Sequence, residues 1–158
     1  MSRLPARPRL RNLVRVVAIG QTQEHNGVRV SLLALEVYDG GCVLSARITS
    51  DQFTDFQRGI FRDLDRFPLR VWDDRGQDYE SFEGGGSSSA GPDFYEAHPN
   101  TTLMPTLEPS ATALSIEIAG IAFQFRDTNA SITGAPHRTP GDTIRGPWLF
   151  HVPIPASP

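Results

Sequence analysis

The chain has 158 residues, a mass of 17.4 kDa and a formal net charge of −3. This length fits one domain whose core needs no disulfide or structural metal. Cys42 is the only cysteine, which excludes an internal disulfide and a zinc site with several thiolates. No apolar run approaches the roughly 20 residues that cross a bilayer, and the negative net charge is not that of a nucleic-acid-binding protein. We therefore expect neither a membrane span nor a nucleic-acid partner.

Basic side chains are concentrated at the N-terminus. All 15 basic residues are arginines, and several precede the first acidic residue, Glu24. Pro5 and Pro8 keep this stretch extended. Residues 1–11 are expected to form a basic arm that either frays or binds an acidic surface of another protein. The candidate partner-binding residues are Arg3, Arg7, Arg9 and Arg11.

The apolar stretch that follows the arm does not have the pattern of a secretory signal. Arg15 interrupts residues 13–19, and no small-x-small cleavage site follows them. A cytoplasmic location is therefore expected, with an extracytoplasmic domain of a processed or tethered protein as the alternative.

The first half of the chain predicts three strands joined by tight turns. Residues 13–19 are rich in Val and Ile, and Asn26–Gly27 tolerates positive φ, which predicts a hairpin into residues 28–38. The apolar parity changes at Leu32–Leu33, which predicts a bulge there. A turn at residues 39–41 leads into an alternating strand that places Cys42 in the core rather than in a reactive site.

Between residues 52 and 67 the pattern changes. Apolar side chains recur every three or four positions, which predicts one short helix, or an irregular crossover, covering one end of the fold. Ser50 or Asp51 would cap this helix and Pro68 would end it.

An acidic hairpin follows. Residues 69–72 and 79–82 are expected to be strands joined by a turn that is rich in Asp and contains Gly76. A calcium ion would take several such carboxylates, but the spacing does not match an EF-hand, and Asp and Gly also favour turns on conformational grounds alone. The candidate metal ligands are Asp73, Asp74, Asp78 and Glu80.

The middle of the chain is interpreted as loop. Residues 84–92 have a Gly/Ser-rich composition typical of a flexible connection, and no lysine follows the glycines as a phosphate-binding loop would require. Residues 94–110 are rich in Pro and Asn and predict a long excursion over the surface.

The last third predicts further strands. Residues 113–125 form either one strand kinked at Gly120 or a hairpin that turns there, residues 128–146 are turn-rich, and residues 148–152 alternate as a final strand. We predict an all-β, immunoglobulin-like antiparallel β-sandwich of about seven to nine strands over residues 12–154, with at most one short helix and a tail at 155–158. Its predicted core includes Leu44, Ala46, Ile48, Val71, Leu114, Ile116, Trp148 and Phe150.

Several hairpin and strand-end signals occur together: Gly27-Val28-x-Val30, Tyr38-Asp39-Gly40-Gly41, Asp73-Asp74-x-Gly76 and Gly146-Pro147-Trp148-x-Phe150. Together they resemble the immunoglobulin-like, telokin-like domains of unknown function found in many bacterial proteins. The resemblance implies an interaction module and carries no catalytic residue.

No catalytic motif is present. The four histidines, His25, His98, His137 and His151, are scattered, and no nucleophile elbow or paired-histidine motif accompanies them. We therefore expect a non-enzymatic interaction or structural module without a cofactor, which binds another protein through the basic arm or an edge strand. The alternative is a small hydrolase or metal-dependent enzyme that uses His98 or His137 with a carboxylate.

Overall fold

A computed structural model describes residues 10–50, 54–55, 60–91, 94–127 and 137–156. Every regular element in this part of the chain is a β-strand, so the predicted all-β class is confirmed. None of the described elements is a helix that could span a bilayer.

Ten strands pair antiparallel in one sheet, in the order β1-β2-β3-β8-β7-β6-β9-β5-β4, with β10 beside β9. The number is higher than the predicted seven to nine. The strands are β1 (Leu13–His25), β2 (Val28–Tyr38), β3 (Gly41–Ser50), β4 (Thr54–Asp55), β5 (Ile60–Arg66), β6 (Arg70–Asp73), β7 (Asp78–Gly91), β8 (Phe94–Met104), β9 (Ala113–Asp127) and β10 (His137–Pro153).

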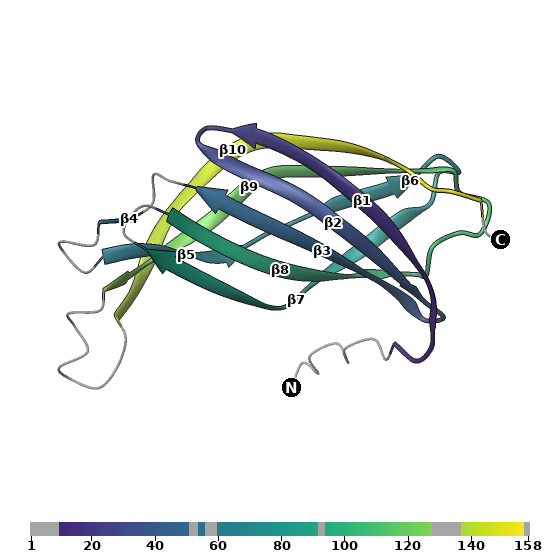
Figure 1. The fold of residues 1–158 in the computed structure, drawn as a ribbon, viewed down its shortest axis with the longest axis horizontal. Helices are drawn as coiled ribbons and strands as arrows, with labels where there is room; N and C mark the ends of the chain where they lie inside the picture. Colours follow the sequence, from purple (N-terminus) through teal and green to yellow (C-terminus); the bar gives the residue numbers. More distant parts are fainter. Residues whose placement is uncertain (1–9, 51–53, 56–59, 92–93, 128–136, 157–158) are drawn as a thin grey trace, which may run out of the picture.

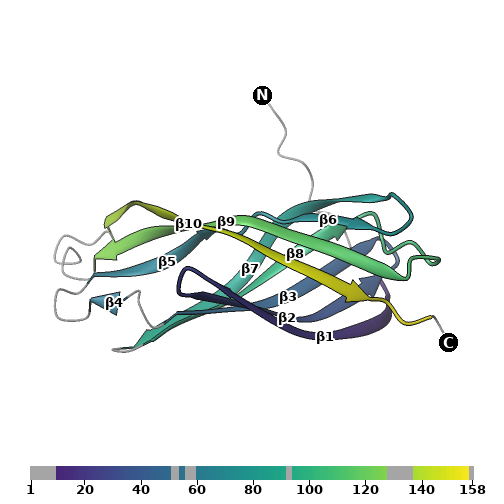
Figure 2. The same ribbon diagram turned by 90° about the horizontal axis from the view of Figure 1, so that it is seen from above.

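The sheet curls until its two ends nearly meet, which gives a barrel-like shape (Figures 1 and 2). Strand β9 pairs with β10 on one side. On its other side it pairs with β6 at residues 114–117 and with β5 at residues 122–127. The first strand, β1, comes to lie beside β10. The interior of this nearly closed sheet is the core of the domain.

The N-terminal hairpin forms as the sequence predicts. Asn26 and Gly27 have φ of 51° and 78°, the left-handed conformation that a tight turn between β1 and β2 requires. The predicted bulge is also present, because the register of β2 against β3 shifts between Leu32 and Ala34. Leu32 and Leu35 are consequently both buried, whereas Leu33 is exposed.

The core is a cluster of buried apolar side chains that the strands contribute from all sides of the barrel-like sheet. All eight predicted core residues are buried in it. Trp148 of β10 is fully buried, and its indole Nε1 donates a hydrogen bond to the carbonyl oxygen of Val28, 3.1 Å away. This contact joins the last strand to the second one across the interior.

The predicted helix over residues 52–67 is wrong where the structure describes it, because residues 60–66 form strand β5. Residues 51–53 and 56–59 lie outside the described part of the chain. Strand β9 pairs with β5 through residues from Asp127 to Ala122. This pairing with a distant part of the chain outweighs the local helical pattern, in which apolar residues recur every three or four positions.

The Gly/Ser-rich stretch and the segment after it are also strands rather than loops. Residues 84–91 complete β7, residues 94–104 form β8, and the two are paired from Gly86–Pro99 to Gly91–Phe94. Positions 84 and 86 require glycine. A Cβ atom at Gly84 or Gly86 would lie only 2.7 or 2.6 Å from a backbone oxygen of β8, which is too close. The glycines that had indicated a loop therefore allow β7 and β8 to pair closely, because they have no side chains.

The C-terminal third holds two long strands. Residues 113–127 are one strand, β9, not a hairpin, and the inward parity changes around Gly120 because Ile118 and Ile121 are both buried. Residues 137–146, predicted to be turn-rich, form the first part of β10. The predicted final strand at residues 148–152 is confirmed as its second part.

Candidate functional site

The first half of β1 exposes an apolar surface. Leu13, Val14 and Val16 have exposed fractions of 54%, 64% and 55%. Strand β1 begins the strand order, so its side away from β2 has no ladder partner among the described strands. We call Leu13, Val14 and Val16 the β1 surface. Apolar side chains on an unpaired strand are characteristic of a site where another chain pairs.

The point where the arm enters the domain is held by Asp39, in the turn between β2 and β3. One carboxylate oxygen, Oδ1, accepts hydrogen bonds from the backbone N–H groups of Arg11 and Asn12, each at 3.3 Å. The other, Oδ2, accepts one from the side-chain amide of Asn12 at 3.2 Å. The backbone hydrogen bond from Asn12 is the largest cause that lowers the pKa of Asp39. Any arm attached here leaves the domain next to the β1 surface.

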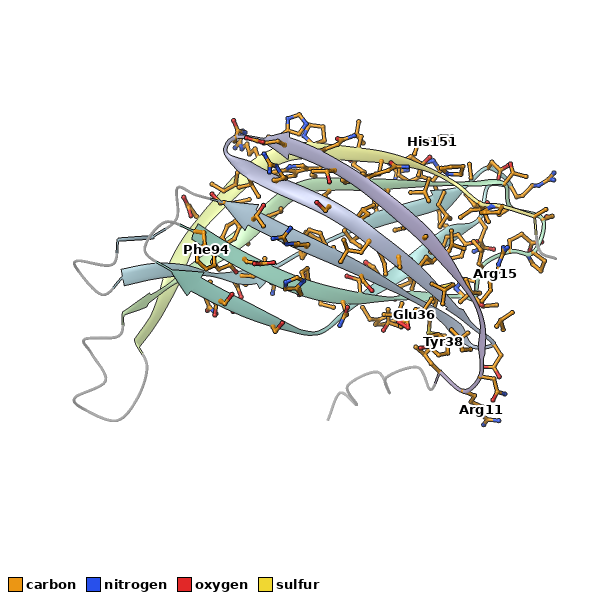
Figure 3. The ribbon with its side chains drawn as sticks, viewed as in Figure 1. Arg11, Arg15, Glu36, Tyr38, Phe94 and His151 are labelled. Atoms are coloured by element: carbon orange, nitrogen blue, oxygen red, sulfur yellow. The ribbon has the colours of Figure 1, made fainter. Side chains whose placement is uncertain are left out.

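Charged and polar groups surround the β1 surface (Figure 3). Arg11 is exposed, and the guanidinium of Arg15 donates to the carbonyl oxygen of Pro155 at 2.8 Å. On β2, the hydroxyl of Tyr38 donates to Glu36 at 3.2 Å. An apolar centre with a polar rim is the usual anatomy of a protein interface.

The second half of β1 is closed against β10 by side chains. The Gln23 amide bonds both backbone groups of Leu149: its Nε2 donates to the carbonyl oxygen, and its Oε1 accepts from the N–H at 3.0 Å. Two residues earlier, Gln21 Nε2 donates to the carbonyl oxygen of His151 at 2.8 Å. We call Gln21 and Gln23 the glutamine latch. The latch occupies this part of the β1 edge and leaves residues 13–18 as its open part.

Two of the four predicted metal-binding carboxylates, those of Asp73 and Asp74, have hydrogen-bond partners in the fold. Asp73 is buried, and its Oδ1 accepts hydrogen bonds from the N–H groups of Arg75 and Gln77 at 2.8 and 3.0 Å. Asp74 bonds Thr112, whose hydroxyl and N–H both donate to it. These two carboxylates therefore fix the β6–β7 turn and the loop before β9.

Asp78 and Glu80 complete the predicted metal set, and both are exposed on β7. Within the residues that the structure describes, no three His, Cys, Asp or Glu side chains are placed to hold one metal ion. The acidic hairpin is present, but its side chains are not gathered around a common centre.

The histidines lie apart from one another. His151 is exposed on β10, and the exposed ring of His25 meets Trp148 edge to face, with centroids 5.8 Å apart. His98 Nε2 lies 2.9 Å from Glu96 Oε1, and the same carboxylate pairs with Arg47, which is the main cause of the lowered pKa of Glu96. The side chain of His137 lies outside the described set.

Among the described contacts, no nucleophile is bonded to His25, His98 or His151. Ser87 is paired with His98 across the ladder, yet no hydrogen bond connects their side chains in the described structure. Cys42 is a buried core residue as predicted, and burial raises the pKa of its thiol, which disfavours the reactive thiolate.

Of the four candidate arm residues, Arg11 is described, while Arg3, Arg7 and Arg9 lie outside the described residues. The β1 surface is not among the sites predicted from the sequence. A signal for it existed, because residues 13–19 carry apolar side chains on both parities and only one face of a strand at this position is buried.

The comparisons with known proteins bear on the fold alone. No family model and no curated protein matches the chain. Among solved structures, the crystal structure of the conserved domain protein from Bacillus anthracis is similar, with a TM-score of 0.52 and 18% sequence identity over 89% of this chain. The match covers 48% of that protein, so the chain spans about half its length.

Proposed function

We propose that the protein is a non-catalytic interaction module that binds an extended segment of a partner protein as an additional strand on β1. The observation that carries the proposal is the β1 surface, where exposed apolar side chains stand on a strand edge with no ladder partner among the described strands. Main-chain hydrogen bonds would supply affinity, and the outward side chains would supply specificity.

The charge around the β1 surface indicates the composition of the partner segment. Arg11 and Arg15 flank the surface, and the sequence places further arginines immediately before them. A segment with alternating acidic and apolar residues would pair its carboxylates with these arginines and pack its apolar side chains on Val14 and Val16. Such charge pairing would raise the association rate and be weakened by salt.

The more specific sequence predictions remain proposals. The relation to immunoglobulin-like, telokin-like domains is supported by the hairpin sequences alone. A hydrolase function has no feature in its favour among the described contacts.

Synthetic peptides test the proposal directly. An eight-residue peptide of alternating Val and Glu is expected to bind, and one of alternating Val and Arg is not, as measured by fluorescence anisotropy at low and high salt. The double variant Val14→Thr/Val16→Thr keeps residues that favour strands but removes the apolar surface, and it should weaken binding about tenfold or more.

Phe94→Thr is the matched control, because Phe94 is also exposed but lies at the opposite end of the molecule from the β1 surface (Figure 3). This variant should bind the acidic peptide as the parent does. Equal binding of both peptides, or equal affinity of the double variant and the parent, would contradict the proposal.

A further inference from the structure

A cleft opens through the wall of the sheet between β5 and the second half of β7. Strand β6 pairs with β7 only at Val71–Tyr79 and Trp72–Asp78, so β7 continues past the end of β6. No backbone ladder joins β5 to β7 within the described residues. The space between them has a volume of about 240 Å³.

Side chains rather than a ladder hold the two sides of the cleft at a fixed separation. The Ser88 hydroxyl donates to Asp63 Oδ1 at 3.0 Å. At the other end, the backbone N–H of Phe67 donates to Glu83 Oε1 at 2.9 Å. The cleft is therefore bounded by defined hydrogen bonds at both ends.

Small residues keep the cleft open. The register of β7 against β8 shifts between Glu83 and Gly86, which marks a bulge formed by two glycines. Gly84, Gly85 and Gly86 form one wall, and Ala97 and Thr101 of β8 line the cleft from the interior side. The three glycines contribute no side chain that could occupy this space.

The lining is acidic and contains a hydroxyl group without a partner. Asp63, Asp65 and Glu83 contribute carboxylates, and none of the described lining residues is basic. Thr101 is only 2% exposed, yet its hydroxyl makes no hydrogen bond to any described residue. Its oxygen is not one of the buried unpaired atoms of the described residues, so it is reached from the cleft that Thr101 lines and is available to a ligand or water there.

The separation of the carboxylates favours an organic cation over a single metal ion as the ligand. Within the described residues, no three acidic, histidine or cysteine side chains could hold one metal ion, and this includes the cleft. A cationic molecule with several atoms can reach separated carboxylates, whereas a single ion cannot. The volume is below the roughly 300–1,000 Å³ of drug-sized sites, which suits a small molecule.

We propose that this cleft is a binding site for a small organic cation, an amine or guanidine that contacts Asp65 and Glu83 through different N–H groups and hydrogen-bonds the Thr101 hydroxyl. The site is separate from the β1 surface, since none of its lining residues lies on β1. Its occupancy would not depend on strand addition there.

Putrescine is a suitable probe, and 1,4-butanediol is its uncharged isostere. In amide-resolved NMR titrations, putrescine is expected to give saturable shifts at the cleft residues of β5, β7 and β8, and 1,4-butanediol none at the same concentration. Thr101→Val preserves the side-chain shape, and Asp65→Asn removes a charge from an exposed position. Each should weaken putrescine binding roughly threefold to tenfold.

Glu80→Gln removes an equal charge from β7 at a position outside the cleft and should leave putrescine binding unchanged. The dispersion of each variant's spectrum shows that it is folded. The proposal is overturned if putrescine gives no saturable shift, if its shifts are spread over the acidic surface, if butanediol binds as well, or if Glu80→Gln weakens binding as much as Asp65→Asn.

Discussion

At the scale of single residues, Trp148 joins the last strand to the second one, two segments that lie far apart in the chain. Its ring is fully buried, and its N–H bonds β2 while its backbone belongs to β10. Trp148→Ala would remove the largest buried side chain of the core and its hydrogen bond to the Val28 carbonyl oxygen. The loss in the free energy of unfolding should be about 3–5 kcal/mol in urea titrations.

The neighbouring residue supplies the control for this prediction. Leu149 is exposed on the other face of β10, so Leu149→Ala should change the free energy of unfolding by less than about 0.5 kcal/mol. A loss below about 1 kcal/mol for Trp148→Ala would mean that the indole ring is not part of a tightly packed core.

Asp74 predicts a specific response to acid. Hydrogen bonds from the side chain and backbone of Thr112 lower its pKa from 3.8 to about 2. A lowered pKa means that folding favours the ionised carboxylate, so this stabilisation is complete above about pH 4 and is lost as the pH falls towards 2. Asp74→Asn should lower the Tm at pH 7 and reduce the fall in Tm between pH 4 and pH 2.

Asp78→Asn is the comparison for Asp74. Asp78 is exposed on the same hairpin, and its carboxylate makes no hydrogen bond in the described structure. If Asp78→Asn lowered the Tm at pH 7 as much as Asp74→Asn does, the effect would come from the net charge of the hairpin and not from the bonds to Thr112.

At the scale of elements, the glycines of β7 should differ sharply in their tolerance of a side chain. A Cβ at Gly86 would lie 2.6 Å from the His98 carbonyl oxygen, whereas one at Gly85 would have no atom within 4 Å. Gly86→Ala should therefore reduce the free energy of unfolding by about 1–3 kcal/mol. Gly85→Ala should leave it unchanged or raise it by up to about 1 kcal/mol. Equal losses for the two variants in thermal unfolding would show that β7 is not closely paired with β8 here.

The predicted and observed elements agree where local signals and tertiary pairing act together. Asn26–Gly27 forces a turn by its own backbone preference, and the alternation in residues 42–48 matches a strand with one face buried. For residues 84–91 and 60–66 the local pattern predicts a loop and a helix, but strands form because neighbouring edges of β8 and β9 remain to be paired. A single sequence does not reveal that an unpaired edge is available.

The candidate sites show the same division. Arg11 could be proposed as a candidate binding residue from charge alone, and the exposed valines of β1 could have been found from their parity. The cleft between β5 and β7 could not be predicted from the sequence. It exists because β6 is short and because β5 and β7 face each other beyond the end of β6. Both conditions are properties of the assembled sheet, not of any segment.

At the scale of the whole molecule, the glutamine latch is one of the contacts that close the sheet between β1 and β10. Gln23→Ala would remove the bonds to both backbone groups of Leu149, and the Leu149 amide should then exchange its hydrogen roughly threefold to tenfold faster. The amide of Ile116, a buried residue of β9, should keep its exchange rate, which would show that the change is local. If the hydrogen-exchange rate of the Leu149 amide did not change, the glutamine latch would not be what protects the contact between β1 and β10.

Because the glutamine latch is uncharged, closure of the sheet and binding of a partner should respond differently to ions. Amide groups carry no charge and do not titrate near neutral pH, so neither counterions nor protons weaken the bonds between β1 and β10. Association through the arginines near the start of β1 would be screened within a Debye length of about 8 Å at physiological ionic strength. A rise in ionic strength would thus release a partner while the sheet stays closed, and the domain would survive each cycle of binding and release intact.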